Sequence, residues 1–172
     1  MNATARDGIR FRVVQTEAGW AAYVAGERGL RRAFLPEADE ATVRARVAAL
    51  APEAVEAPRL RPELARQLRE YFRGRDLALD APIDWEGITP FRRRVYEALA
   101  ATAPGETLSY GELARRAGSP GAARGVGSAM AANPFPPFVP CHRVVGSDGS
   151  LRGFSGPGGP LFKARLLELE GR

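Results

Sequence analysis

Residues 109–133, with the sequence SYGELARRAGSPGAARGVGSAMAAN, decide the fold of the second half of this chain. Ser109 and Glu112 have the spacing of a capping box, in which each side chain accepts a hydrogen bond from a backbone N–H at the start of a helix. We expect this helix to run from Tyr110 to about Ala117 and to end at the glycine that follows.

A second helix is predicted directly after the first. Ser119 and Pro120 match an N-cap and a first helical residue, and the helix should end near Ala132, because Asn133-Pro134 disfavours helical backbone. Two short helices joined by a glycine-containing turn form a helix-turn-helix. The second helix has almost only small side chains, and each glycine costs it up to ~1 kcal/mol relative to alanine. Close packing on another helix, or close approach to a nucleic-acid groove, would offset that cost.

A proline-rich segment, 133–140, follows these helices and leads into the only cysteine of the chain, Cys141, and its only histidine, His142. The thiolate is the reactive form of cysteine, and a neighbouring imidazole can take the thiol proton. One cysteine and one histidine can form neither a disulfide nor a Cys/His zinc site. From the pair alone, an inert buried cysteine and an activated nucleophile are both possible.

The first part of the chain predicts a small α/β domain without a motif that carries chemistry. Apolar residues alternate with polar ones at 9–13, and an apolar run follows a glycine at 30–35, so both stretches indicate strands. Apolar residues at helical spacing predict helices over 37–50 and 63–72.

A linker is expected at residues 80–87, between two domains. We therefore predict a supporting α/β domain over 1–82 and a second domain over 83–172. Thr89-Pro90 should start the first helix of the second domain, as N-cap and first helical residue.

Composition is that of an ordinary globular protein, with 45% hydrophobic and 26% charged residues among 172. The formal charge of +5 suits a polyanionic partner, although scattered surface arginine is common. We see no apolar run long enough for a signal peptide or a membrane span. An intracellular, reducing location is expected, which also suits a free reactive thiol.

Five stretches, in this order, resemble the active-site domain of the O6-alkylguanine-DNA alkyltransferases, also called methylated-DNA–protein-cysteine methyltransferases. They are 109–114 (SYGELA), 122–127 (AARGVG), Asn133-Pro134, 140–144 (PCHRV), and Leu166-Leu167 with Glu170-Gly171. The resemblance implies an α/β, ribonuclease H-like N-terminal domain and a mostly α C-terminal domain with a winged helix-turn-helix. It also implies DNA repair by single-use transfer of the alkyl group from O6-alkylguanine, and from O4-alkylthymine, to Cys141 after base flipping.

The resemblance gives catalytic roles to four residues. Cys141 is the nucleophile, His142 takes its proton through a water, and Glu170 orients the imidazole. Asn133 hydrogen-bonds at the hinge between the second helix and the cysteine segment. Without the resemblance, Asn133 would be a helix cap and Glu170 a surface carboxylate.

The implied DNA-binding residues are Tyr110, Ala122, Ala123, Arg124, Gly127 and Ser147. Arg124 would take the place of the flipped base, and Tyr110 would rotate the phosphate beside it. Ser147 lies in a turn at 146–150 that would form the wing. A solvated arginine, a half-buried tyrosine and an ordinary hairpin turn are the alternatives without DNA.

The implied substrate pocket consists of Tyr110, Pro136, Val144, Phe154, Ser155 and Lys163. Three positions depart from the family pattern. Phe154 stands where tyrosine is usual, the turn at 155–160 is longer and richer in proline, and Arg92 replaces a glutamine.

The implied partner is double-stranded DNA that contains O6-alkylguanine. We expect a monomer in the cytoplasm, of bacterial type and associated with the nucleoid, with no cofactor, no metal ion and no membrane contact. A non-enzymatic alkylguanine-sensing protein is the main alternative, but those proteins carry tryptophan where Cys141 stands. A papain-like hydrolase would need a histidine far from its cysteine, and a phosphotriester-sensing regulator would need further zinc-binding cysteines.

Overall fold

The computed structural model describes residues 8–151 and 153–171. It consists of two compact units, one that ends at Asp84 and one that begins at Trp85. Ile83 forms a β-bridge with Leu30, and Asp84 N donates to Leu30 O over 2.9 Å. These contacts keep part of the expected linker within the first unit, so the units divide slightly later than the sequence suggested.

The first unit contains a four-stranded sheet in the order β3-β2-β1-β4. Its elements are β1 (Arg10–Thr16), β2 (Gly19–Gly26), β3 (Gly29–Glu37), α1 (Glu40–Leu50), β4 (Val55–Glu56) and α2 (Pro62–Phe72). The first three strands are antiparallel neighbours, and β4 pairs parallel with β1. The strands expected at 9–13 and 30–35 are confirmed as β1 and β3.

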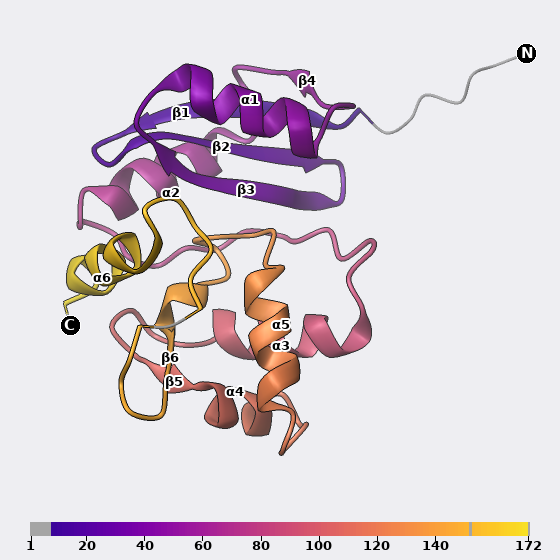
Figure 1. The fold of residues 1–172 in the computed structure, drawn as a ribbon. Coiled ribbons are helices and arrows are strands. Elements are labelled where there is room, and N and C mark those ends of the chain that lie inside the picture. Colours follow the sequence, from indigo (N-terminus) through magenta and orange to yellow (C-terminus); the bar gives the residue numbers. More distant parts are fainter. Residues whose placement is uncertain (1–7, 152, 172) are drawn as a thin grey trace, which may run out of the picture. The chain divides into compact units, whose positions relative to one another are not determined.

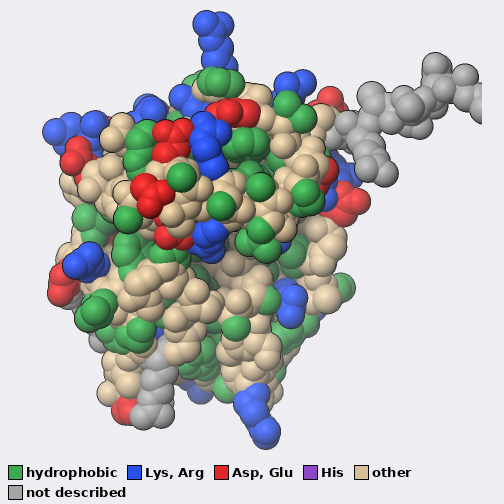
Figure 2. All heavy atoms as spheres, turned by 45° about the horizontal axis from the view of Figure 1, so that its top comes forward, with side chains coloured by type: hydrophobic (Ala, Val, Ile, Leu, Met, Phe, Trp, Pro, Cys, Tyr) green, Lys and Arg blue, Asp and Glu red, His purple; other side chains and the backbone are tan. Residues whose placement is uncertain are grey.

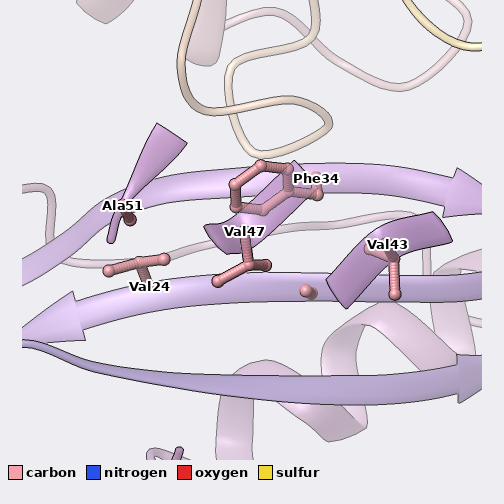
Figure 3. Close-up of a cluster of buried hydrophobic side chains, with 6 residues drawn as sticks. Val24, Phe34, Val43, Val47 and Ala51 are labelled. Atoms are coloured by element: carbon pink, nitrogen blue, oxygen red, sulfur yellow. The ribbon is translucent and has the colours of Figure 1, made fainter. Parts of the chain in front are cut away.

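The two helices cover opposite faces of this sheet (Figure 1). Ala22 and Val24 of β2 pack in one core with Val43 and Val47 of α1, as Figure 3 shows for the labelled members. Tyr23 points to the other face, where its hydroxyl donates to Leu60 O over 2.6 Å just before α2. Because both faces of β2 are buried, the strand has no apolar–polar alternation, and the sequence did not reveal it.

Helix α1 begins later than residue 37, where the sequence placed it. Glu37 still pairs with Trp20 in the sheet, and Asp39 is the N-cap, with its carboxylate accepting from Thr42 N over 2.8 Å. Acidic side chains at 37 and 40 therefore serve different elements.

The second unit is mostly helical. Its elements are α3 (Pro90–Ala100), β5 (Leu108–Ser109), α4 (Tyr110–Arg116), α5 (Ala123–Ala131), the 3₁₀ turn η1 (Cys141–Arg143), β6 (Val144–Val145) and α6 (Gly159–Leu169). Strands β5 and β6 are parallel, with Leu108 opposite Val144. Tyr96 of α3 and Trp85 both contact the buried ring of Phe135 edge-on.

Two of the predicted helix starts are confirmed. Thr89 caps α3 by accepting from Arg92 N over 3.3 Å, with Pro90 as the first helical residue. Ser109 and Glu112 form the complete capping box of α4.

The predicted start of the next helix is wrong. Ser119 and Pro120 belong to a turn in which Ala122 N donates to Ser119 O over 3.1 Å. Gly121 takes φ +86° in that turn, which a right-handed helix cannot include. Helix α5 therefore begins at Ala123, with no side-chain cap.

Positive and negative side chains are interspersed on the face shown in Figure 2. In the first unit, for example, Arg44 pairs with Glu40 and Glu56, both over 2.8 Å. Within residues 8–151 and 153–171, no helix has the length and apolar character needed to span a bilayer.

Candidate active site

The cysteine and the histidine lie in η1, which the preceding segment supports. Cys141 N donates to Val139 O, and Arg143 N donates to Pro140 O, both over 2.9 Å. Cys141 keeps some accessible surface, whereas His142 is only 1% exposed. The backbone thus places the cysteine residue at the edge of the core and the imidazole inside it.

Asn133 ties the end of α5 to the cysteine segment. Its Nδ2 donates to Val139 O over 2.8 Å, and its Oδ1 accepts from Phe135 N over 3.0 Å. Its side chain also hydrogen-bonds to the Cys141 sulfur. Asn133 is therefore more than a helix cap, because it fixes the backbone that carries the thiol.

Burial raises the pKa of the Cys141 thiol, and the hydrogen bond from Asn133 and the charge of Lys163 act in the opposite direction. Lys163 is 1% exposed and donates to Val144 O. Burial also lowers the pKa of Lys163, whereas the electrostatic effect of Cys141 raises it. Because the thiol is held in its protonated form, its reaction needs a base.

His142 is the candidate for that base. Burial lowers the pKa of His142, against the effect of Glu170, so the imidazole is neutral near pH 7. Its Nε2 lies 2.8 Å from Oε1 of Glu170. An ionised carboxylate can only accept, so Nε2 carries the proton and Nδ1 carries the lone pair.

The Glu170 side chain is fully buried. Burial alone would raise the pKa of Glu170, but its hydrogen bonds from His142 and Arg143 outweigh that effect and hold the pKa well below its usual range. Gly105 N adds a further hydrogen bond to Oε2 over 3.0 Å. The carboxylate at the end of α6 is thus a charged group inside the core.

The sequence interpretation missed Arg143. Its Nε and Nη2 donate to the two oxygens of Glu170 over 2.9 and 3.0 Å, and its Nη1 donates to Thr102 O over 2.6 Å. The signals available were its place next to the Cys-His pair and its presence in the matching stretch at 140–144, and neither gave it a role. Its burial depends on Thr102 and Glu170, which are distant in sequence.

Tyr110 approaches the site because β5 pairs with β6. The register brings Ser109 opposite Val145, so Tyr110 starts α4 beside the cysteine segment. Burial raises the pKa of Tyr110, and the nearby Cys141 adds to that effect. Its hydroxyl lies 2.8 Å from the point where a Cβ on Gly153 would stand.

Of the expected pocket, Tyr110, Val144 and Lys163 are brought to the cysteine by the contacts above. Pro136 and Phe154 are half-buried and Ser155 is exposed. Within the described part of the chain, no hydrogen bond or ion pair joins these three residues to Cys141, His142 or Lys163. Their place in a pocket stays a prediction.

Helix α5 has a buried face and an open face. Val126, Ala129 and Met130 are buried, whereas Arg124 is exposed and a Cβ on Gly127 would meet no atom within 4 Å. Arg124 and Gly127 are three residues apart, so they share one face. Ala122 and Ala123, both half-buried, lie at the start of this helix.

Ser147 is exposed in the turn after β6. The turn closes through Gly149 N, which donates to Gly146 O over 2.8 Å. Ser147 and Ser109 line one groove of about 480 Å³ at the start of α4. Within the described residues, no group of three or more His, Cys, Asp or Glu side chains is placed to hold a metal ion.

Comparisons with known proteins point to one family. Residues 90–172 match the family model described as 6-O-methylguanine DNA methyltransferase, DNA binding domain. A methylated-DNA–protein-cysteine methyltransferase of Mycobacterium tuberculosis H37Rv is 49% identical over 104 residues, which cover 60% of this chain and 61% of the relative. The relative with the same name from Mycolicibacterium paratuberculosis is 46% identical over 117 residues, covering 68% of this chain and 69% of the relative.

Solved structures extend the likeness to both units. The crystal structure of Mycobacterium tuberculosis OGT in complex with DNA matches with a TM-score of 0.76 and 36% identity, over 94% of this chain and 92% of that chain. The O6-methylguanine-DNA methyltransferase of Pyrococcus kodakaraensis matches with a TM-score of 0.72 and 28% identity, over 94% of this chain and 99% of that chain. The sequence matches are narrower, since the chain spans about 61% of the length of the first curated relatives.

Proposed function

This chain belongs to the methylated-DNA–protein-cysteine methyltransferase family, and we propose that it repairs DNA by taking an alkyl group from guanine O6 onto Cys141. The observation that carries the proposal is the buried chain of contacts from the cysteine segment through His142 to Glu170, with 2.8 Å between Nε2 and Oε1. A thiol held protonated by burial gains a neutral base beside it.

The proposed reaction is an in-line displacement at the alkyl carbon. His142 takes the thiol proton, directly or through a water, and a sulfur electron pair forms the new S–C bond. The C–O6 bond breaks with its electrons on the guanine, which regains a proton from the imidazolium or from solvent. Oxygen-linked alkyl groups on thymine O4 would follow the same course.

The product is a thioether, and its S–C bond is stable to water. Because this bond is not hydrolysed, we expect each molecule to act once. We propose no turnover beyond this first transfer and no cofactor.

We propose double-stranded DNA as the partner, bound by the open face of α5. Small residues on that face allow a close approach, and Arg124 projects from its first turn. An O6-alkyl group cannot reach a thiol while the base is stacked, so the nucleotide must be flipped, at a cost of a few kcal/mol. Tyr110 is the first residue of α4 and stands beside the cysteine segment, where a flipped nucleotide would enter.

We also propose a finer fold assignment for each of the two units. The order β3-β2-β1-β4 with β4 parallel to β1 fits a ribonuclease H-like supporting domain. Helices α4 and α5 with the turn at 146–150 fit a winged helix-turn-helix. We propose a monomer that acts on nucleoid DNA in the cytoplasm; the relatives named above from two mycobacterial species support a bacterial type of protein.

Repair of a defined lesion tests the proposal. A duplex with one O6-methylguanine should regain guanine, measured by digestion and chromatography, when it is incubated with an equimolar amount of the protein. Cys141→Ser should bind the duplex and leave the lesion intact. Unchanged O6-methylguanine after incubation with the folded wild-type protein would refute the proposed reaction.

A further inference from the structure

We infer that Arg143 is a positioning residue: it holds the Glu170 carboxylate against His142 and thereby fixes which ring nitrogen of His142 carries the proton. This inference rests on the proposed function, because it concerns how His142 is kept in the tautomer that can accept the thiol proton. It rests on a group of contacts that we call the carboxylate clamp, formed around Glu170 by Thr102, Gly105 and Arg143.

The carboxylate clamp saturates both oxygens of Glu170. Oε1 accepts from His142 Nε2 over 2.8 Å and from Arg143 Nη2 over 3.0 Å. Oε2 accepts from Arg143 Nε over 2.9 Å and from Gly105 N over 3.0 Å. The carboxylate therefore cannot rotate away from His142 without breaking several of these bonds.

Thr102 anchors the other end of the guanidinium. Arg143 Nη1 donates to Thr102 O over 2.6 Å and to Thr102 Oγ1 over 2.9 Å. Thr102 and Arg143 are each 5% exposed, so water cannot replace these contacts. A lysine could supply the charge, but it lacks the planar fork that reaches two carboxylate oxygens and a third acceptor together.

Gly105 is required by the same geometry. It takes φ +80°, and a Cβ there would lie 2.9 Å from the backbone oxygen of Glu170. The loop after α3 thus comes close enough to Glu170 to donate its backbone N–H only because this residue has no side chain.

Charge explains why Arg143, rather than the other clamp members, is decisive. Three charged or titratable groups act on the hydrogen-bonded His142 and Glu170 side chains or lie next to them. They are Arg143, Lys163 and the Cys141 thiol. Glu106 feels Arg143 at longer range, but it already pairs with Arg116 over 2.8 Å. Since His142 is neutral, Arg143 is the cation that compensates the buried carboxylate directly.

Loss of that cation would change the chemistry of His142. A buried carboxylate without a counter-charge takes up a proton. A protonated Glu170 would donate to Nε2 of His142, and the ring proton would move to Nδ1. The lone pair that should accept the thiol proton would then be lost, although every residue of the relay was still present.

The experiment reads the tautomer directly. Because His142 is the only histidine of the chain, the imidazole ¹⁵N spectrum of the labelled full-length protein reports this one ring. We expect the Nε2–H tautomer in the wild type and in Arg143→Lys, and a shift toward Nδ1–H in Arg143→Met. Arg116→Met removes a neighbouring ion pair and should leave the spectrum and the transfer rate unchanged.

The single-turnover transfer rate gives the second readout. The transfer rate of Arg143→Met should be ~10²–10⁴-fold lower than that of the wild type, as expected when a general base is lost. As the pH is lowered, its rate should begin to fall at a higher pH than the wild-type rate, because Glu170 takes up a proton more easily. In the Glu170→Gln background, the same Arg143→Met change should have little further effect.

Three results would overturn the inference. They are an Nδ1–H tautomer in the wild type, a wild-type spectrum in a folded Arg143→Met protein, and rate losses that simply multiply in the double variant. If Arg143→Met does not fold, Thr102→Val removes one acceptor of the guanidinium and should move the tautomer the same way; an unchanged spectrum there would also contradict us. The spectra do not depend on alkyl transfer, so failure of the proposed function would be recognised separately.

Discussion

Phe91 and Gly125 are in close contact between α3 and α5: a Cβ on Gly125 would lie 3.1 Å from Cζ of the ring. Close helix packing thus accounts for this glycine. It does not account for Gly127, where a Cβ would meet no atom within 4 Å. Of the two explanations that the sequence left open for the small residues of α5, helix packing applies to Gly125, and approach to DNA stays a prediction for Gly127.

The first prediction compares these two glycines. Gly127→Ala should raise the free energy of unfolding by about 0.5–1 kcal/mol, because alanine favours the helix and nothing obstructs its methyl group. The same methyl group should weaken binding to duplex DNA, since it stands on the face that carries Arg124. Urea unfolding and DNA titration measure the two effects.

Gly125→Ala is the matched control. Its methyl group would crowd Phe91, so it should give less stabilisation than Gly127→Ala or none, and a smaller loss of DNA affinity. Equal behaviour of the two variants in both measurements would remove the argument that α5 approaches DNA through its open face.

A second prediction concerns Arg124. If it fills the space of a flipped base, Arg124→Ala should slow transfer much more on duplex O6-methylguanine than on a short single strand or on free O6-benzylguanine, which need little unstacking. A simple phosphate contact would instead change the salt dependence of binding by about one unit. Equal rate losses on all three substrates would indicate a damaged pocket.

The third prediction separates chemistry from binding. His142→Ala and Glu170→Gln should slow single-turnover transfer ~10²–10⁴-fold, because general-base assistance is lost, with little change in DNA affinity. We expect the wild-type rate to fall on the acid side as His142 takes up a proton, and this fall should disappear in His142→Ala. Wild-type rates in both variants would remove the relay from the mechanism.

A fourth prediction follows from the lowered pKa of His142. In the unfolded chain the imidazole takes up a proton below about pH 6.5, whereas burial opposes protonation in the folded protein. The contribution of His142 to the free energy of unfolding should therefore be fully present above that pH. Below it, the free energy of unfolding should fall by at most about 1.4 kcal/mol per pH unit, because one proton is involved. Urea midpoints at pH 7 and pH 5.5 measure this.

His142→Gln is the control for the pH dependence, because it removes the only histidine. The variant should show little change in its midpoint between these two pH values, even if it is less stable at both. An identical slope in the wild type and the variant would assign the acid loss to other groups.

Local sequence signals predicted local structure well here. The capping box at Ser109 and the Thr89-Pro90 start are confirmed, because caps depend on residues a few positions apart. The α5 start was wrong because Ser119-Pro120 also fits a turn, and only the positive φ of Gly121 decides between the two. Strand β2 was missed because burial on both faces leaves no alternation to detect.

The site shows the same division. The adjacent cysteine and histidine are visible in the sequence, and the family pattern supplied Glu170 and Asn133. Arg143 was missed, since its role depends on a carboxylate and a threonine that only the fold brings to it. A buried ion pair has no local signature, and the chain has many other arginines.

The mass of the protein after reaction tests the central claim most directly. Incubated with an excess of O6-methylguanine duplex, the wild-type protein should gain the mass of one methyl group, and peptide mapping should place it on Cys141. Cys141→Ala should gain nothing. Continued loss of O6-methylguanine beyond one equivalent, or a methyl group on any other residue, would contradict a single-use transfer to Cys141.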